Sequence, residues 1–202
     1  MLPNIDLLKL KARKPLGAFM SYKDIPSSFG RVSKIIHWFS AVMVIAAWFI
    51  GITMVDLPKG PLRGTTFGIH FTIGFLVLTF SAARIIWRQF NLHPDHPPQA
   101  TQFQLIAARL AHISLYLLLF IMPMTGAFSV WLNGFPLTIF ELITIASPVA
   151  TDKALGLIFS QIHTVAAWVM AATVMAHLLA ALWHHFVMHD QTLMQMLPNR
   201  DS

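Results

Sequence analysis

Regularly spaced histidines are the residues of this chain best suited to bind metal. His163 and His177 lie 14 residues apart within one apolar stretch. In a helical bundle with a 3.5-residue repeat, that step returns to the same helix face after four turns. At a rise of about 1.5 Å per residue, the two imidazoles would be about 21 Å apart along the helix. One helix face could therefore supply a ligand to each of two centres, one above the other.

The choice of metal chemistry is narrowed by the absence of cysteine among the 202 residues, which include ten histidines. Without cysteine there are no disulfides, iron–sulfur clusters, thiolate-bound metals or covalently attached haems. Two neutral imidazoles on one haem iron fill both axial positions, and such a haem transfers single electrons. The spacing therefore predicts two non-covalent b-type haems.

The composition indicates that lipid surrounds much of the chain. Hydrophobic residues make up 56% and charged residues 11%, whereas about a quarter of a soluble domain is charged. The net charge of +6 could suggest nucleic acid, but the basic residues gather at the edges of apolar stretches, as topology signals do. We therefore expect a membrane protein with lipid around it and no nucleic-acid partner.

Four apolar stretches are long enough, at about 20 residues, to cross a bilayer. They cover Ile35–Val55, Phe67–Trp87, Leu105–Trp131 and Leu157–Val187. The predicted fold class is all-α, an integral membrane four-helix bundle. We expect one di-haem domain over residues 31–198, a cytoplasmic N-terminal extension over 1–30 and a short tail over 199–202.

The Lys and Arg residues predict the orientation of these spans. Eleven of them flank the spans on the side of the two termini, and three flank the other side. Since the more basic side faces the cytoplasm, both termini are expected there. The residues before the first span contain no apolar core of a cleaved signal.

Depth in the membrane predicts how the histidines pair. An ionisable residue at this depth is costly and is by default a functional candidate. The second span starts outside, so His70 lies at the depth of His163. The first span starts inside, so His37 pairs with the inner His177.

Small neighbouring residues favour the same four histidines, since a flat porphyrin needs space beside its ligand. Four positions after them come Ala41, Gly74, Ala167 and Ala181. The corresponding residues after His112 and His184 are Tyr116 and Met188. Alanine and glycine are also common in membrane helices for packing reasons. His112 and His184 therefore stay as alternative ligands of the inner haem.

Two further residues are candidates for contacts with the cofactor or substrate. Arg84 lies 14 residues after His70, where it could pair with the propionates of the inner haem or act as a boundary anchor. His184 follows His177 by seven residues. It could bind a propionate, donate a proton or hydrogen bond to quinone, or simply lie at the membrane interface.

Several segments resemble the bacterial cytochrome b561 family. They are RVSKIIHW, HFTIGFLVLTFSAARIIWR, AARLAHISLYLLLFIMPMTG and HTVAAWVMAATVMAHLLAALWHHFVMHDQTLMQMLP, and they cover nearly everything from Arg31 to Pro198. The last is the most specific, because it combines the 14-residue histidine spacing with HHF and with D-x-T-L before M-x-P.

The resemblance implies a bundle in the bacterial inner membrane with two haem b groups, ligated by His37, His70, His163 and His177. It also implies ubiquinone as substrate, and some family members oxidise superoxide at the periplasmic face. We therefore expect an oxidoreductase that moves electrons from a periplasmic donor, superoxide or a redox protein, to ubiquinone. One alternative is an electron-relay anchor subunit of a hydrogenase- or dehydrogenase-type complex. Another is a haem-free proton-coupled transporter.

Overall fold

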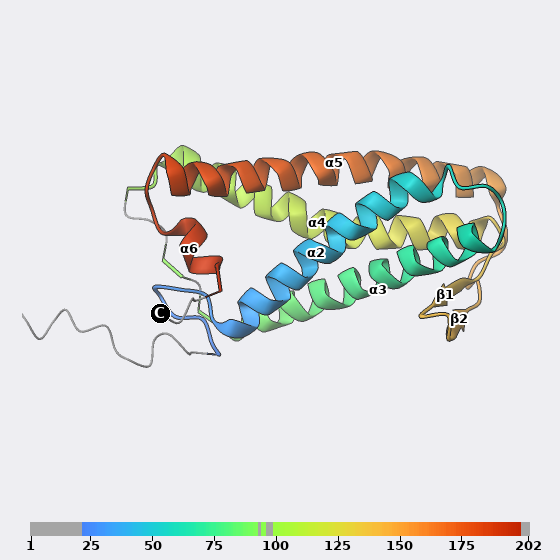
Figure 1. Cartoon of the computed structure of the whole chain (residues 1–202), viewed down its shortest axis with the longest axis horizontal. Coiled ribbons are helices and arrows are strands. Elements are labelled where there is room, and N and C mark those ends of the chain that lie inside the picture. The colour runs from blue at the N-terminus through green and yellow to red at the C-terminus, as the bar shows by residue number, and fades with distance from the viewer. Residues whose placement is uncertain (1–21, 93, 96–98, 199–202) are drawn as a thin grey trace, which may run out of the picture.

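The computed structural model describes residues 22–92, 94–95 and 99–198, and four long helices form the body of this part of the chain (Figure 1). They are α2 (Arg31–Met54), α3 (Pro61–Gln89), α4 (Gln102–Leu132) and α5 (Lys153–Phe186). Each is long and apolar enough to cross a membrane. The four predicted spans are thus confirmed, with each helix beginning several residues before its span. Residues 1–21 and 199–202, within the predicted extension and tail, lie outside the described residues.

The surface of the bundle is apolar. Side chains such as Phe49, Val165 and Trp168 are more than half exposed, which suits a surface that meets lipid rather than water. Helices α4 and α5 contain 31 and 34 residues, more than the roughly 20 that a bilayer requires. They therefore tilt or project beyond the hydrocarbon.

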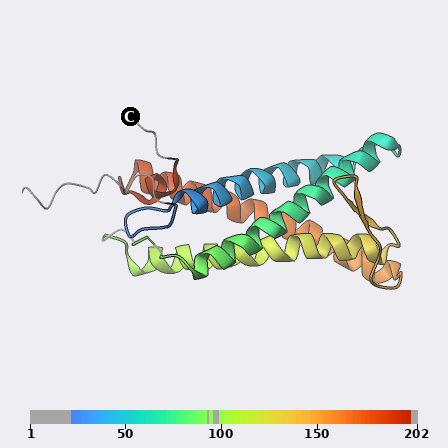
Figure 2. The same ribbon diagram turned by 90° about the horizontal axis from the view of Figure 1, so that it is seen from below.

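The bundle consists of two pairs of helices. Helix α2 packs along α3, and α4 packs along α5, while α5 makes few close backbone contacts with α2 or α3. Figure 2 shows α2 and α4 on opposite sides with α3 crossing between them. The buried core lies near the middle of the bundle, at Val77, Leu118, Leu119, Ala166 and Met170. Further buried apolar side chains, Met54, Leu132, Leu137 and Ile139, lie toward the hairpin end.

The two ends of the bundle are distinct (Figure 1). The terminal end carries the start of α2 and the short helix α6 (Thr192–Met196). There Trp38 Nε1 donates to the Met196 carbonyl at 2.9 Å, and Ser28 Oγ donates to the Gln195 carbonyl at 3.3 Å. These bonds hold the C-terminal segment against the start of the first long helix.

Aspartate side chains near the helix starts accept hydrogen bonds from backbone N–H groups that have no partner within the helix. Asp24 accepts from the Gly30 N–H at 2.7 Å and from Ser33 Oγ at 2.9 Å at the start of α2. Asp152 accepts from the Leu155 N–H at 3.0 Å at the start of α5. These contacts stabilise the first turns of two helices that carry histidines.

The hairpin end carries two short antiparallel strands, β1 (Leu137–Ile139) and β2 (Ile143–Ile145). Sequence patterns predicted only a loop here. Phe140 and Glu141 both have positive φ angles, 54° and 55°, and the Leu142 N–H donates to the Ile139 carbonyl. This is a type I′ turn without its usual Gly or Asn, so the sequence does not signal it. The Phe140 N–H donates to Thr72 Oγ1 at 2.8 Å, which ties the turn to α3.

Candidate functional site

The candidate site consists of two levels, each containing one residue from every long helix. The hairpin level lies nearer the hairpin end and consists of Gly51, His70, Gly126 and His163. The terminus level lies nearer the terminal end and consists of His37, Arg84, His112 and His177. On every helix the two members are 14 residues apart. Neighbouring helices run in opposite directions, but the step is the same 14 residues on each. The two members on every helix therefore lie at the same two depths of the bundle.

At each level, the imidazole carried by α5 faces an imidazole of another helix. His70 and His163 have ring centroids 6.2 Å apart, and His37 and His177 have centroids 6.3 Å apart. In both pairs α5 supplies one ring, and the α2–α3 pair supplies the other. The structure therefore brings together the two pairs that depth predicted.

The separation of the rings suits a metal between them. A metal–imidazole bond is about 2 Å, and a ring nitrogen lies about 1 Å from its centroid, so two rings on one metal have centroids about 6 Å apart. The helices that carry the paired rings make few close backbone contacts. A Cβ at Gly74, one turn after His70, would meet no atom within 4 Å. The donor set and the spacing fit a haem ligated by two imidazoles.

At the hairpin level, His163 is oriented by α4. Its Nδ1 lies 3.0 Å from the Met122 carbonyl and 3.3 Å from Thr125 Oγ1. Since a carbonyl only accepts, Nδ1 carries the proton and Nε2 keeps its lone pair for a metal. A Cβ at Gly126 would lie 3.0 Å from His163 Cε1. Glycine at this position therefore makes room for the ring.

His70 is oriented by α2 in a similar way. A Cβ at Gly51 would lie 3.1 Å from His70 Cε1. The backbone of Ala47 is within reach of the His70 ring, although Nδ1 makes no hydrogen bond of regular geometry. The contact is thus looser than that of His163, but it also places a ring against glycine and beside the backbone four residues earlier.

The terminus level has no glycine beside its rings. His37 Nδ1 is buried and has no hydrogen-bond partner. Arg84 lies within electrostatic range of His37 and of His177. The ring centroid of His112 is 5.6 Å from that of His177. The structure therefore brings the alternative ligand His112 to the inner pair.

Arginine and tyrosine side chains form a cluster next to the terminus level. The guanidinium groups of Arg84 and Arg88 lie 5.7 Å and 5.8 Å from the ring centroid of Tyr116. Arg88 Nη1 also donates to Tyr116 Oη at 3.4 Å. These contacts restrain Arg84 near the histidines. In this position its guanidinium group could bind an anionic group at the terminus level.

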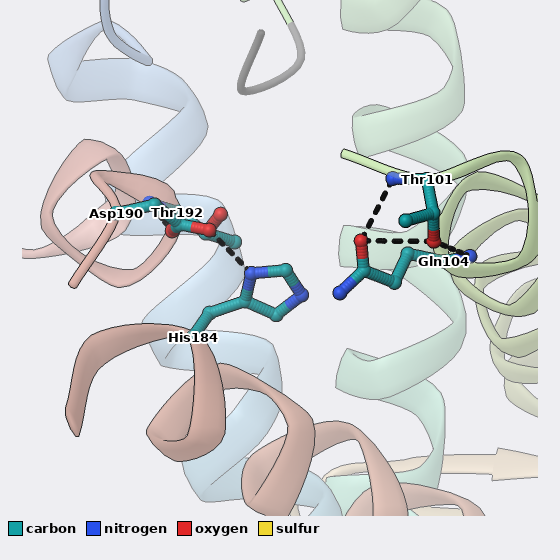
Figure 3. A network of polar contacts seen from close by, with 5 residues as sticks. All are labelled: Thr101, Gln104, His184, Asp190 and Thr192. Atoms are coloured by element: carbon teal, nitrogen blue, oxygen red, sulfur yellow. Dashed lines mark hydrogen bonds and ion pairs between the residues drawn. The ribbon is translucent and has the colours of Figure 1, made fainter. Parts of the chain in front are cut away.

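His184 lies in the last turn of α5, and Figure 3 shows its ring next to Asp190. Its Nδ1 lies 2.5 Å from Asp190 Oδ2, and Asp190 also accepts from the Thr192 N–H at 2.8 Å. Burial acts to raise the pKa of Asp190, but the hydrogen bonds from Thr192 and His184 outweigh it and lower the pKa. When Nδ1–H donates its hydrogen bond to this carboxylate, the opposite ring nitrogen, Nε2, is the one that can exchange a proton.

Sequence reasoning missed Gly51, Gly126 and Asp190, and it placed His112 outside the chosen set. The signal for the glycines and for His112 was present, because the same 14-residue step occurs in all four spans. The signal for Asp190 was weaker, since it needs the chain to turn back after α5 toward His184.

A four-helix membrane bundle with two levels of facing imidazoles has the architecture of a b-type cytochrome. Residues 28–199 match the family model described as prokaryotic cytochrome b561. The chain belongs to this family, and it is therefore a multi-pass protein of the bacterial inner membrane that uses haem b in electron transport.

Two relatives come from Escherichia coli strain K12. Cytochrome b561 homolog 2 is 30% identical over 190 residues, which cover 91% of this chain and 98% of the relative. Cytochrome b561 homolog 1 is 27% identical over 187 residues, or 85% and 98% of the two chains. A third relative, described as probable superoxide oxidase CybB of Yersinia pestis, is 28% identical over 167 residues, or 82% and 93%.

Proposed function

We propose that this cytochrome holds two haem b groups, one at each level, and passes single electrons through them from a periplasmic donor to ubiquinone. Two imidazole pairs with centroid separations of 6.2 Å and 6.3 Å carry the proposal. His70 and His163 would hold the haem at the hairpin level. His37 and His177 would hold the one at the terminus level.

The orientation follows from the basic residues. Those before the first span and after the second are on the terminal side, and the basic side of a membrane protein faces the cytoplasm. Both termini and the terminus level therefore face the cytoplasm, and the hairpin level faces the periplasm.

When bound, each haem supplies a one-electron carrier whose two axial positions are already filled. The chain holds the two ligands on α5 14 residues apart, or about 21 Å along the helix. The apolar core between the levels, which includes Val77, Leu118 and Met170, keeps water out of the path. Protons and electrons are thereby kept on separate routes.

Two residues on the cytoplasmic side have roles in this proposal, Arg84 toward the haem and His184 toward the quinone. Arg84 pairs with a propionate of the terminus-level haem, since it lies beside His37 and His177. His184, oriented by Asp190, donates a proton to quinone from the free side of its ring. Reduction of one quinone to quinol takes up two electrons and two protons, so a proton donor at this face is needed.

The proposed donor is superoxide, which the name of the Yersinia pestis relative suggests. Two superoxide ions would give two molecules of dioxygen and two electrons, and these electrons would reduce one ubiquinone. A soluble redox protein in the periplasm is the other donor of this class, and it would make the chain a relay subunit of a larger complex.

A purified chain in lipid nanodiscs tests the proposal. A superoxide-generating system and a short-chain ubiquinone are added, and quinol formation is followed in the ultraviolet. We expect quinol at half the rate of the protein-dependent part of the superoxide loss, and no quinol above the protein-free background with His163→Ala. If the wild-type chain contains haem but forms no quinol with superoxide, the donor assignment is wrong, and recovery on adding a partner would identify a relay subunit.

A further inference from the structure

The hairpin level contains the same local arrangement twice. On α4, the Gly126 position faces His163, and the carbonyl of Met122, four residues earlier, lies 3.0 Å from Nδ1 of that ring. On α2, the Gly51 position faces His70, and the backbone of Ala47, again four residues earlier, is within its reach. We call each arrangement a glycine seat.

The geometry of a helix explains why the glycine stands four residues after the carbonyl. A helical carbonyl points toward the residue four positions later, so a side chain there covers its accessible side. At Gly126, an added Cβ would lie 3.2 Å from His163 Nδ1 and 3.0 Å from Cε1. Only glycine lets the ring approach the carbonyl edge-on, and the ring then presents Nε2 to the space between the helix pairs.

We propose that Gly51 and Gly126 are positioning residues of the periplasmic haem, and that their seats give this haem the lower midpoint potential of the two. A carbonyl that accepts the Nδ1 proton makes the imidazole a stronger donor to its metal. A stronger donor stabilises the ferric state and so lowers the potential. This inference rests on the proposed function, because it assumes a haem at each level.

The surroundings of the terminus level favour a higher midpoint potential. Its positions on α2 and α4, where the hairpin level has glycine, are occupied by His37 and His112. The Nδ1 atoms of His37 and of His70 at the hairpin level both lack a hydrogen bond of regular geometry, so the difference rests on the His163–Met122 contact and on the positive charge of Arg84 near both terminus-level rings. A nearby cation favours the reduced state and raises the potential. Electrons would therefore run downhill from the periplasmic haem to the cytoplasmic haem.

Potentiometric titration of the holoprotein tests this inference. The variants are Gly126→Ala and Gly51→Ala, and the matched control is Gly64→Ala on α3, where a Cβ would meet no atom within 4 Å. All three changes replace a helical glycine by a better helix former. Low-temperature EPR adds a second readout, because the low-spin g-values depend on how the two imidazole rings are oriented.

We expect a positive shift of the lower midpoint in Gly126→Ala and a smaller one in Gly51→Ala, whose contact is looser. The EPR signal of the same haem should move, and the upper midpoint should stay in place. Loss of the periplasmic haem alone, with the cytoplasmic haem retained, would also support the seats.

The inference is overturned if both variants titrate like Gly64→Ala, or if the upper midpoint moves as much as the lower one. It is also overturned if His163→Ala removes the haem of higher potential. A wild-type chain without haem would instead overturn the proposed function itself, so the two failures are distinguishable.

Discussion

The two levels hold nearly identical pairs of imidazoles in different surroundings. Their ring separations differ by only about 0.1 Å. At the hairpin level, the other two register positions are glycines that let the rings approach backbone carbonyls. At the terminus level, the two register positions outside the His37–His177 pair hold Arg84 on α3 and His112 on α4. In the proposed account, the histidines decide where haem binds, and the residues that face them from the adjacent helices decide how each haem behaves.

Removal of a single proposed ligand should have the largest effect, because it should empty one level and leave the other occupied. We expect His70→Ala and His163→Ala to lose the same periplasmic haem, and His177→Ala to lose the cytoplasmic one. Each variant would keep about half of the haem absorbance, because an imidazole-ligated iron requires both axial partners for its low-spin spectrum. Pyridine haemochrome analysis measures the content, and potentiometry identifies the haem that remains.

The pairing is wrong if His70→Ala and His163→Ala leave different haems. Loss of both haems from every variant would instead indicate that the bundle depends on full loading, and the potentials of the single variants His70→Met and His163→Met would then decide the pairing, since both should shift the same midpoint.

Replacement of Arg84 should sharpen the difference between the levels. In Arg84→Gln we expect a negative shift of the higher midpoint, because a positive charge beside His37 and His177 is removed. Arg88→Gln is the matched control, since Arg88 stacks on the same Tyr116 ring without lying near both histidines. Equal shifts of both midpoints in Arg84→Gln would contradict a role confined to the terminus level.

Asp190 should affect proton transfer without affecting haem binding. Asp190→Asn is expected to slow quinol formation by about 10-fold, a part of what a positioned general acid contributes, with unchanged haem content. Asp95→Asn, an exposed carboxylate, is the control. An unchanged rate in Asp190→Asn would remove His184 and Asp190 from the proton path.

The acid stability of the C-terminal segment follows from the same carboxylate. Its pKa is lowered from 3.8 in the folded chain, so the ion pair contributes its full stability above pH 3.8 and loses it as the pH falls through the lowered value. The hydrogen-exchange protection of residues 192–196, taken relative to the intrinsic rate at each pH, should therefore fall only in strong acid, whereas in Asp190→Asn it should already be low at neutral pH. Identical exchange in the two proteins would show that the contact does not hold the segment.

His112 should produce the smallest change. Its ring is 5.6 Å from His177, but in the proposed account His37 provides the second imidazole at this level. We expect His112→Ala to retain both haems and to shift the higher midpoint slightly. Complete loss of the cytoplasmic haem would mean that His112, and not His37, is the ligand.

The spans and the histidine pairs were predictable because each depends on one strong regularity. Apolar stretches of about 20 residues mark the helices, and the step from His163 to His177 marks the two levels. The pairing of His37 with His177 needed one more assumption, namely that antiparallel helices place them at equal depth. The structure places the rings of His37 and His177 6.3 Å apart and that of His112 5.6 Å from His177, so the pairing stays a prediction.

Other features depend on contacts that no local pattern reports. The hairpin turns at Phe140 and Glu141 without glycine, so turn chemistry gives no sign of it. Gly51 and Gly126 looked like ordinary packing residues of membrane helices, because their partners lie on other helices. Asp190 is brought to His184 by a reversal of the chain after α5, which the residues between them do not signal.

The number of haems per chain tests the central claim most directly. The purified protein is quantified by amino-acid analysis, and its haem by the pyridine haemochrome method, alongside a reduced-minus-oxidised spectrum. Two levels of paired imidazoles predict two haem b per chain and two separate midpoints in a redox titration. A single haem per chain, or a spectrum without the α-band of a six-coordinate b-type haem, would contradict the account.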